Sequence, residues 1–185
     1  MKPGARALGV AESFQSDVST LAGVVVRASR VVDGFVFGRA SVGGTDATDA
    51  VIDLVFRLER PDVQFILLSG IAPAWYNILD LYAIHEAVDR PVISVTYEES
   101  SGLEESLNAE FSGEARDTRL DICRRQPDRD RLLVNDETLF VRAVGLEEAE
   151  AHDVVRAFTP EGGRPEPLRV ARLAARAVDQ MGADS

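Results

Sequence analysis

The chain has 185 residues, of which 31 are acidic and 20 basic, so its formal net charge at pH 7 is −11. Its hydrophobic content of 45% is ordinary for a globular protein, and no apolar run approaches the ~20 residues that span a bilayer. Cys123 is the only cysteine, which excludes an intrachain disulfide, and the first residues lack the apolar core of a signal peptide. We therefore expect one cytoplasmic domain over residues 1–185, with no membrane partner.

The basic residues are almost all arginine, because Lys2 is the only lysine. An acidic, lysine-poor composition is typical of halophilic proteins from salt-rich cytoplasms, although high genomic GC content also favours arginine over lysine. The charge argues against a simple nucleic-acid binder, because phosphate contacts need a basic surface. At ~1 M salt the Debye length is only ~3 Å, so a nucleic-acid partner must be held by close contacts rather than by a long-range field.

Three antiparallel strands are predicted in the first 40 residues: Arg6–Val10, Thr20–Ala28 and Val31–Ala40. The last two are joined by so short a link that they must be antiparallel. The first strand is expected to end at Ala11–Ser13, followed by a polar loop over Phe14–Ser19. An apolar stripe then predicts a helix over Ala47–Leu58, with Thr45 or Asp46 as its cap and Pro61 beyond its end.

The run Phe65–Leu68 has no polar break and stops at Ser69-Gly70, which is typical of a strand buried on both faces. A helix over Ala74–Val88 and a second buried strand over Pro91–Tyr97 complete a parallel crossover unit. Ligands in open α/β sheets sit at the carboxyl ends of the strands. Ser69 and Gly70 lie at such an end.

The remainder of the chain is predicted to be rich in helices. We expect a loop over Glu98–Gly102 and a hairpin in which Leu132–Val134 pairs with Thr138–Val144. We also expect four helices, over Leu103–Phe111, Ala115–Arg125, Leu146–Ala157 and Leu168–Met181. Three antiparallel strands that feed parallel crossovers are the pattern of the α/β ribonuclease H-like fold. Carboxylates at neighbouring strand ends of that sheet can hold two divalent ions about 3.5–4 Å apart for phosphodiester cleavage.

Three stretches of the chain resemble an archaeal family of unknown function, number ninety-nine, which is in turn similar to endonuclease V. They are Leu8–Ser13, then Val42–Thr48 running on to Leu67–Ala72, and Arg164–Arg172 with its Pro-Glu-Pro-Leu-Arg motif. The resemblance covers nearly the whole chain in the same order. It implies an endonuclease V-like core, and that enzyme cuts nucleic acid near deaminated purines.

The resemblance also implies metal ligands that this sequence has replaced. In endonuclease V the first strand ends in a metal-binding aspartate, where this chain has Ala11, with Glu12 one step beyond. The central strand should end Asp-Gly but ends Ser69-Gly70, and Arg172 stands where a histidine or an acid is often found. An arginine ~4 Å from a metal opposes each unit of positive charge by ~4 kcal/mol at an effective dielectric of ~20. A magnesium site is therefore not expected at these positions, and a one-residue shift that turned Glu12 inward would supply only one carboxylate.

Two hypotheses of function follow. The first, which the substitutions favour, is a non-catalytic or altered relative that uses no cofactor or metal and binds a nucleotide, an anion or a partner. Its candidate binding residues are Glu12, Asp46, Ser69, Gly70, Asn77 and Arg172. The second is a surviving divalent-metal-dependent endonuclease acting on nucleic acid through Glu12, Asp46 and Asp49. A structural role as a subunit also stays open, as does the oligomeric state.

Other chemically distinctive residues have ordinary interpretations. His85 is expected to be a surface or satisfied histidine on a helix that packs on the sheet, and His152 an exposed helix residue. Trp75 and Tyr76 could stack a base, but aromatic residues beside a core strand are usually packing. Cys123 has no partner cysteine, so a metal or redox role is not expected.

Overall fold

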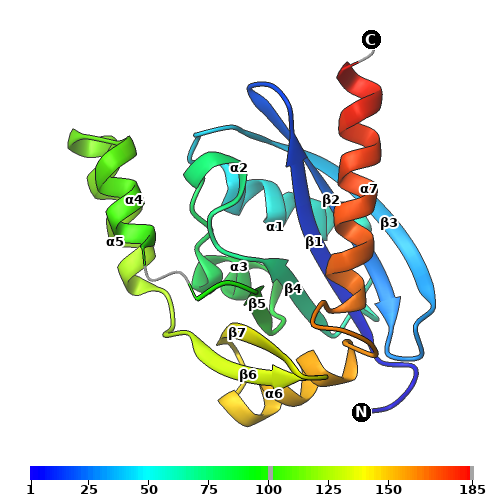
Figure 1. Ribbon diagram of the computed structural model, residues 1–185. Coiled ribbons are helices and arrows are strands. Elements are labelled where there is room, and N and C mark those ends of the chain that lie inside the picture. The colour runs from blue at the N-terminus through cyan, green and yellow to red at the C-terminus, as the bar shows by residue number, and fades with distance from the viewer. Residues whose placement is uncertain (100–101, 184–185) are drawn as a thin grey trace.

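The computed structural model describes residues 1–99 and 102–183 (Figure 1). Within them, strands form one mixed sheet in the order β3-β2-β1-β4-β5-β7-β6. The strands are β1 (Arg6–Phe14), β2 (Val18–Arg27), β3 (Val32–Ser41), β4 (Phe65–Ser69), β5 (Val92–Thr96), β6 (Asp130–Val134) and β7 (Glu137–Val144). The helices are α1 (Ala47–Leu58), α2 (Pro73–Tyr76), α3 (Leu81–Val88), α4 (Leu103–Glu110), α5 (Gly113–Arg125), α6 (Glu148–Ala157) and α7 (Glu166–Ala183). No helix of the described residues is long and apolar enough to cross a membrane.

The centre of the sheet is parallel and its two flanks are antiparallel. Strand β4 pairs in parallel with β1 on one side and with β5 on the other. The first three strands are antiparallel, as predicted. However, β1 is longer than predicted, because Ala11–Phe14 keeps pairing with β2, as far as Phe14 opposite Ser19. The expected loop over Phe14–Ser19 therefore shrinks to the few residues between the two strands.

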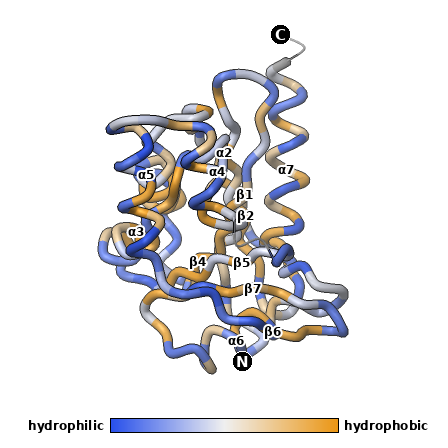
Figure 2. Tube along the Cα trace, turned by 60° about the vertical axis from the view of Figure 1, so that its left-hand side comes forward, coloured by the Kyte–Doolittle hydropathy of each residue, from blue (hydrophilic) through white to orange (hydrophobic). Residues whose placement is uncertain are grey.

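Helices cover both faces of this sheet (Figure 1). On one face α1 and α3 bury their apolar stripes against alternate residues of β1 and β4, in a cluster that includes Leu8, Val10, Ile66, Leu68, Val51, Leu54, Leu81 and Ile84. On the other face α6 and α7 pack on the intervening strand residues, in a second cluster that includes Ala7, Leu67, Ile93, Val154, Phe158 and Leu168. Helix α7 alternates hydrophobic and hydrophilic residues along its length, as Figure 2 shows, and so lays one stripe on β1 and β2.

The predicted helix over Ala74–Val88 is wrong in its first half. Ala74, Trp75 and Tyr76 have φ values of 49°, 55° and 60°, in the left-handed region that non-glycine residues rarely adopt. The regular helix α3 starts only after Asp80, whose side chain accepts hydrogen bonds from the backbone N–H groups of Tyr82 and Ala83. The apolar spacing predicted a continuous helix, but it does not reveal the sharp turn at residues 74–76 or the helix cap at Asp80.

Helices α4 and α5 pack on each other beside the segment that follows β4, around Leu107, Leu120 and Ile78. Both agree closely with the predicted ranges, as do α1 and the β6–β7 hairpin. In the predicted loop over Glu98–Gly102, Glu98, Glu99 and Gly102 lie outside helices and strands, whereas Ser100 and Ser101 lie outside the described residues.

Candidate functional site

A pocket of about 710 Å³ opens at the carboxyl ends of β4 and β5. Ser69 and Gly70 line it from β4, and Thr96 and Tyr97 line it from the end of β5. Five arginines also line it, and we call it the arginine pocket after them: Arg124, Arg129, Arg142, Arg164 and Arg172. Its carboxylates are Glu98, Glu104 and Asp128. A chain with a net charge of −11 therefore gathers an excess of positive charge in this pocket.

Several of these arginines are fixed by contacts inside the pocket. The guanidinium of Arg164 lies over the ring of Tyr97, 4.5 Å from its centroid, and that of Arg129 lies over Phe140 at 4.9 Å. Arg142 donates a hydrogen bond to the backbone carbonyl of Pro127, and its burial lowers its pKa. The arginines therefore present oriented donors at the pocket wall.

Two pocket arginines make neither an ion pair nor a hydrogen bond among the described residues. Arg124 forms an ion pair with Glu104 at 2.9 Å and Arg142 bonds to the carbonyl of Pro127, whereas Arg164 and Arg172 have no such partner. Both carry charge close to Tyr97: burial raises the pKa of that phenol, and the charges of Arg164 and Arg172 partly oppose the rise. Since a free guanidinium offers a planar fork of donors, these two arginines suit a phosphate or a carboxylate.

The polar atoms at the strand ends leave one hydrogen-bonding group unused. Thr96 Oγ1 is buried and has no hydrogen-bond partner in the described part of the chain. Gly70, with φ +80°, turns the chain at the end of β4, and its N–H donates to the carbonyl of Val95. An unpaired buried hydroxyl needs an explanation, and a ligand in the pocket supplies one.

The residues at the neighbouring ends of β1 and β4 do not fit the divalent metal ions that the fold suggests. Val10 pairs with Leu68, so Ala11 and Ser69 are the next residues on the two strands. Ala11 is buried against Ala171 of α7, and Arg172 follows on that helix. A methyl group, a hydroxyl and a guanidinium are not the hard anionic oxygens that Mg²⁺ requires. Ala11, and not Glu12, thus faces α7.

Glu12 projects to the opposite face of β1, because neighbouring strand residues alternate. Its carboxylate accepts a hydrogen bond of 2.7 Å from the hydroxyl of Ser19. Glu12 does not line the arginine pocket. Glu12 and Arg172 therefore do not meet in this pocket.

Asp46 and Asn77 form a separate hydrogen-bonded group between β3, α1 and the segment after β4. The Asp46 carboxylate accepts from the backbone N–H and the hydroxyl of Ser41, and from Asn77 Nδ2 at 2.7 Å. Burial raises the pKa of Asp46, but these hydrogen bonds outweigh it and lower the pKa overall. Asp46 makes no capping hydrogen bond to α1, contrary to prediction; the fully buried Asn77 instead accepts from the N–H of Ala47 at 2.9 Å.

Of the six candidate binding residues, the structure thus brings together Ser69, Gly70 and Arg172 in one pocket. Glu12 lies apart from them, as does the pair Asp46 and Asn77, and Asp49 is exposed in the first turn of α1. Of the other pocket arginines, Arg124 falls in the helix predicted over Ala115–Arg125, Arg142 in the predicted hairpin and Arg164 at the start of the third motif stretch, and none was singled out as a binding residue. Arg129 falls in the charged segment Gln126–Arg131, which is typical of a turn.

Arg119 of α5 is a further residue that the sequence does not single out. It is only 4% exposed, and burial lowers its pKa. It stacks on Phe111 at 4.0 Å and donates to the backbone carbonyls of Tyr76, Gly43 and Gly44. This side chain therefore holds α5, the left-handed turn after β4 and the β3–α1 loop together behind the pocket.

The two histidines differ from each other. His85 contacts the carbonyl of Arg90 through Nδ1 at 2.8 Å. It is therefore a satisfied histidine, which is one of the two alternatives that the sequence predicted. His152 is not the exposed residue predicted: it is half-buried, and its Nε2 is buried. Cys123 lines the arginine pocket, where burial raises the pKa of its thiol.

Comparison with known sequences places these features in a family. The family model described as endonuclease dU matches residues 3–179 of this chain. A UPF0215 protein of Pyrobaculum calidifontis is 33% identical over 175 residues, which cover 92% of this chain and 95% of the relative. A second UPF0215 protein, from Thermococcus kodakarensis, is 33% identical over 187 residues, with coverage of 96% and 94%. The resemblance inferred from the sequence motifs is confirmed.

Comparison with solved structures confirms the fold. A protein of unknown function from Archaeoglobus fulgidus superposes with a TM-score of 0.85 at 28% identity, covering 94% of this chain and 98% of the other. Ciona intestinalis endonuclease V, in complex with a DNA that contains an inosine, gives 0.66 at 13% identity, with coverage of 96% and 86%. Human ENDOV gives 0.63 at 17% identity, with coverage of 97% and 86%. The sheet and its helices are therefore endonuclease V-like, which is a ribonuclease H-like arrangement.

Proposed function

Because the chain belongs to the endonuclease dU family, we propose that it binds a single strand of nucleic acid in the arginine pocket, without metal-dependent cleavage at the ends of β1 and β4. One observation carries the proposal: in an acidic chain, five arginines converge on one pocket at the carboxyl ends of β4 and β5. Arg164 and Arg172 hold backbone phosphates, as the two pocket arginines that make neither an ion pair nor a hydrogen bond among the described residues.

The size of the pocket supports a nucleotide as its occupant. Its volume of about 710 Å³ lies within the range of ~300–1,000 Å³ that small-molecule sites occupy. The unpaired Thr96 hydroxyl, at the end of β5, offers a hydrogen bond to the base or sugar. The names of the relatives suggest the class of base: one family description refers to dU, and a structural relative is complexed with inosine-containing DNA. A strand with a deaminated base is therefore the ligand to test first.

The alternative is divalent-metal-dependent cleavage through Glu12, Asp46 and Asp49. The family description and the endonuclease V-like fold speak for it. The geometry speaks against it, because Glu12 is bonded to Ser19, Asp46 is bonded to Ser41 and Asn77, and none of the three lines the arginine pocket. The same experiment can distinguish the two functions.

The test is fluorescence anisotropy with labelled single strands that contain deoxyuridine, deoxyinosine or no deaminated base, in EDTA. We expect wild type to bind and the double variant Arg164→Ala/Arg172→Ala to bind about 100-fold more weakly. Each lost charge-assisted hydrogen bond is worth at least ~1.5 kcal/mol, or about tenfold in affinity. Arg176→Ala is the matched control, because Arg176 is an exposed arginine one turn further along α7 that does not line the pocket.

Three results would contradict the proposal. The first is an unchanged affinity in the double variant, and the second is the absence of binding by wild type in EDTA. The third is strand cleavage with Mn²⁺ that disappears in Glu12→Ala, measured on a denaturing gel with the same oligonucleotides. That third result would establish the alternative, a metal-dependent endonuclease rebuilt around Glu12.

A further inference from the structure

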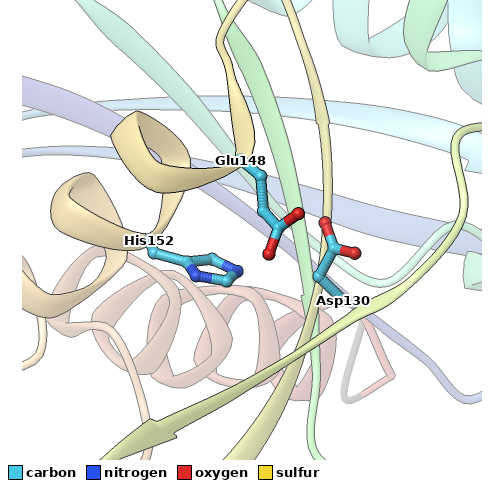
Figure 3. A group of neighbouring side chains, drawn as sticks. All are labelled: Asp130, Glu148 and His152. Atoms are coloured by element: carbon cyan, nitrogen blue, oxygen red, sulfur yellow. The ribbon is translucent and has the colours of Figure 1, made fainter.

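Three potential metal ligands meet where α6 packs beside the start of β6. They are Asp130, at the first position of β6, and Glu148 and His152, which lie four residues apart on one face of α6. One ligand atom from each lies within 4.8 Å of the other two. Figure 3 shows the outer edge of the imidazole ring, which carries Nε2, pointing toward the two carboxylates. We call these three residues the α6–β6 cluster.

His152 Nε2 is buried and has no hydrogen-bond partner, one of two such side-chain atoms in the described part of the chain. A buried polar atom without a partner is rare in folded proteins, and it marks a missing ligand or strain. The cluster also holds two carboxylates close together, and their like charges repel unless a cation lies between them. Both features are resolved by one positive ion that accepts a nitrogen and two oxygen ligands.

We propose that the α6–β6 cluster binds a zinc ion through His152 Nε2 and one oxygen each of Asp130 and Glu148. Zinc takes imidazole nitrogen and carboxylate oxygen at ~2.0–2.2 Å, usually with four ligands. Ligand atoms around a tetrahedral zinc lie about 3.3 Å apart, so rotation of the side chains brings the cluster to that spacing. A nitrogen ligand disfavours Mg²⁺, which prefers oxygen, and the fourth position is left for water because Glu148 is exposed.

The site is distinct from the place where the fold suggests catalytic metals. It lies on the antiparallel flank of the sheet, in β6 and α6, and not at the ends of β1 and β4. A bound ion would join α6 to the edge hairpin β6–β7. Asp130 follows Arg129, which lines the arginine pocket, so the ion would also fix the chain beside that pocket. The proposal does not depend on nucleic-acid binding.

The test is calorimetric titration of zinc alone into chelator-treated protein at neutral pH, with thermal unfolding as a second readout. We expect one zinc per chain in wild type and a higher melting temperature with zinc, because a ligand that binds only the folded state stabilises it. His152→Gln and Asp130→Asn should each weaken binding by at least about 100-fold, beyond the ~10–100-fold effect of an outer-shell partner. Asp153→Asn is the control, since Asp153 is an exposed acid on the same helix outside the cluster.

Glu148→Gln provides a decisive test even if His152→Gln or Asp130→Asn, which change half-buried residues, fails to fold. Glu148 is exposed, so its replacement leaves the packing intact while removing one ligand. Weakened zinc binding in Glu148→Gln with a wild-type melting temperature in EDTA would support the site. The proposal is overturned if wild type binds no zinc, or if the cluster variants bind it as tightly as Asp153→Asn does.

Discussion

Gly9 sits where β1 touches the start of α7, and the contact leaves no room for a side chain. A Cβ at this position would lie 2.3 Å from the carbonyl carbon of Pro167, which is backbone and cannot rotate away. We expect Gly9→Ala to lower the free energy of unfolding by about 1–3 kcal/mol, because β1 and α7 must move apart. Gly4→Ala is the matched control, since nothing lies within 4 Å of its added Cβ.

Denaturant unfolding of both variants measures this difference. An unchanged midpoint in Gly9→Ala would mean that α7 is not seated on β1 as described. The contact also joins two of the three motif stretches, Leu8–Ser13 and Arg164–Arg172, so both contribute to one packing interface.

The roles of single polar residues were the least predictable from the sequence. Asp46 precedes a helix and has the chemistry of a cap, yet its carboxylate bonds back to Ser41, and the cap comes from Asn77 thirty residues later. Capping by Asn77 in place of Asp46 depends on the path of the chain after β4, which the sequence pattern does not specify. The positions of Ser69, Gly70 and Arg172 at one pocket could be anticipated, because strand ends and motif positions are local or family features; their role in binding stays a prediction.

At the scale of elements, Asp33 joins three strands and the end of α1. Its carboxylate accepts hydrogen bonds from Arg27 on β2, Arg6 on β1 and Arg60 beyond α1, at 2.7–3.1 Å. These bonds, from Arg27 first, hold the pKa of Asp33 far below its ordinary range. A carboxyl group with a lowered pKa stabilises the fold above its unfolded pKa, and the contribution is lost as the pH falls toward the folded value.

We therefore expect Asp33→Asn to lower the melting temperature at neutral pH, with a difference from wild type that shrinks as the pH falls below about 4. Melting temperatures measured from pH 7 to pH 2 check this. Asp53→Asn is the control, because Asp53 is an exposed acid that pairs only along α1 with Arg57. A difference that stayed constant over this range would show that the charge of Asp33 does not hold these elements together.

Element types followed from local pattern, but the end of β1 and the start of α3 did not. Helix α1 has the predicted bounds because its apolar stripe, the left-handed Glu59 after it and Pro61 all agree locally. The break between α2 and α3 was missed because apolar spacing alone does not reveal three left-handed residues. These are held by tertiary contacts, among them the hydrogen bond from Arg119 to the carbonyl of Tyr76.

At the scale of the whole molecule, the combination of antiparallel and parallel strands was predictable and the arginine pocket was not. The order of strands and crossover helices restricts the topology, because parallel connections need a helix between strands. The pocket, in contrast, gathers arginines from α5, the 126–129 segment, β7 and the chain around α7. Those segments are far apart in the sequence, so the excess of positive charge in the pocket cannot be seen in a net charge of −11.

Salt dependence distinguishes the pocket from the charge of the whole chain. Each phosphate contact to a single strand contributes about −0.7 to the slope of log affinity against log salt. Two contacts, from Arg164 and Arg172, predict a slope of about −1.4 in wild type, and a slope near zero in Arg164→Ala/Arg172→Ala. Arg176→Ala should keep the wild-type slope. Anisotropy titrations at several salt concentrations measure all three. A wild-type affinity that rises with salt would mean that repulsion from the acidic surface governs binding, because salt screens exposed charges at long range before it competes with close contacts.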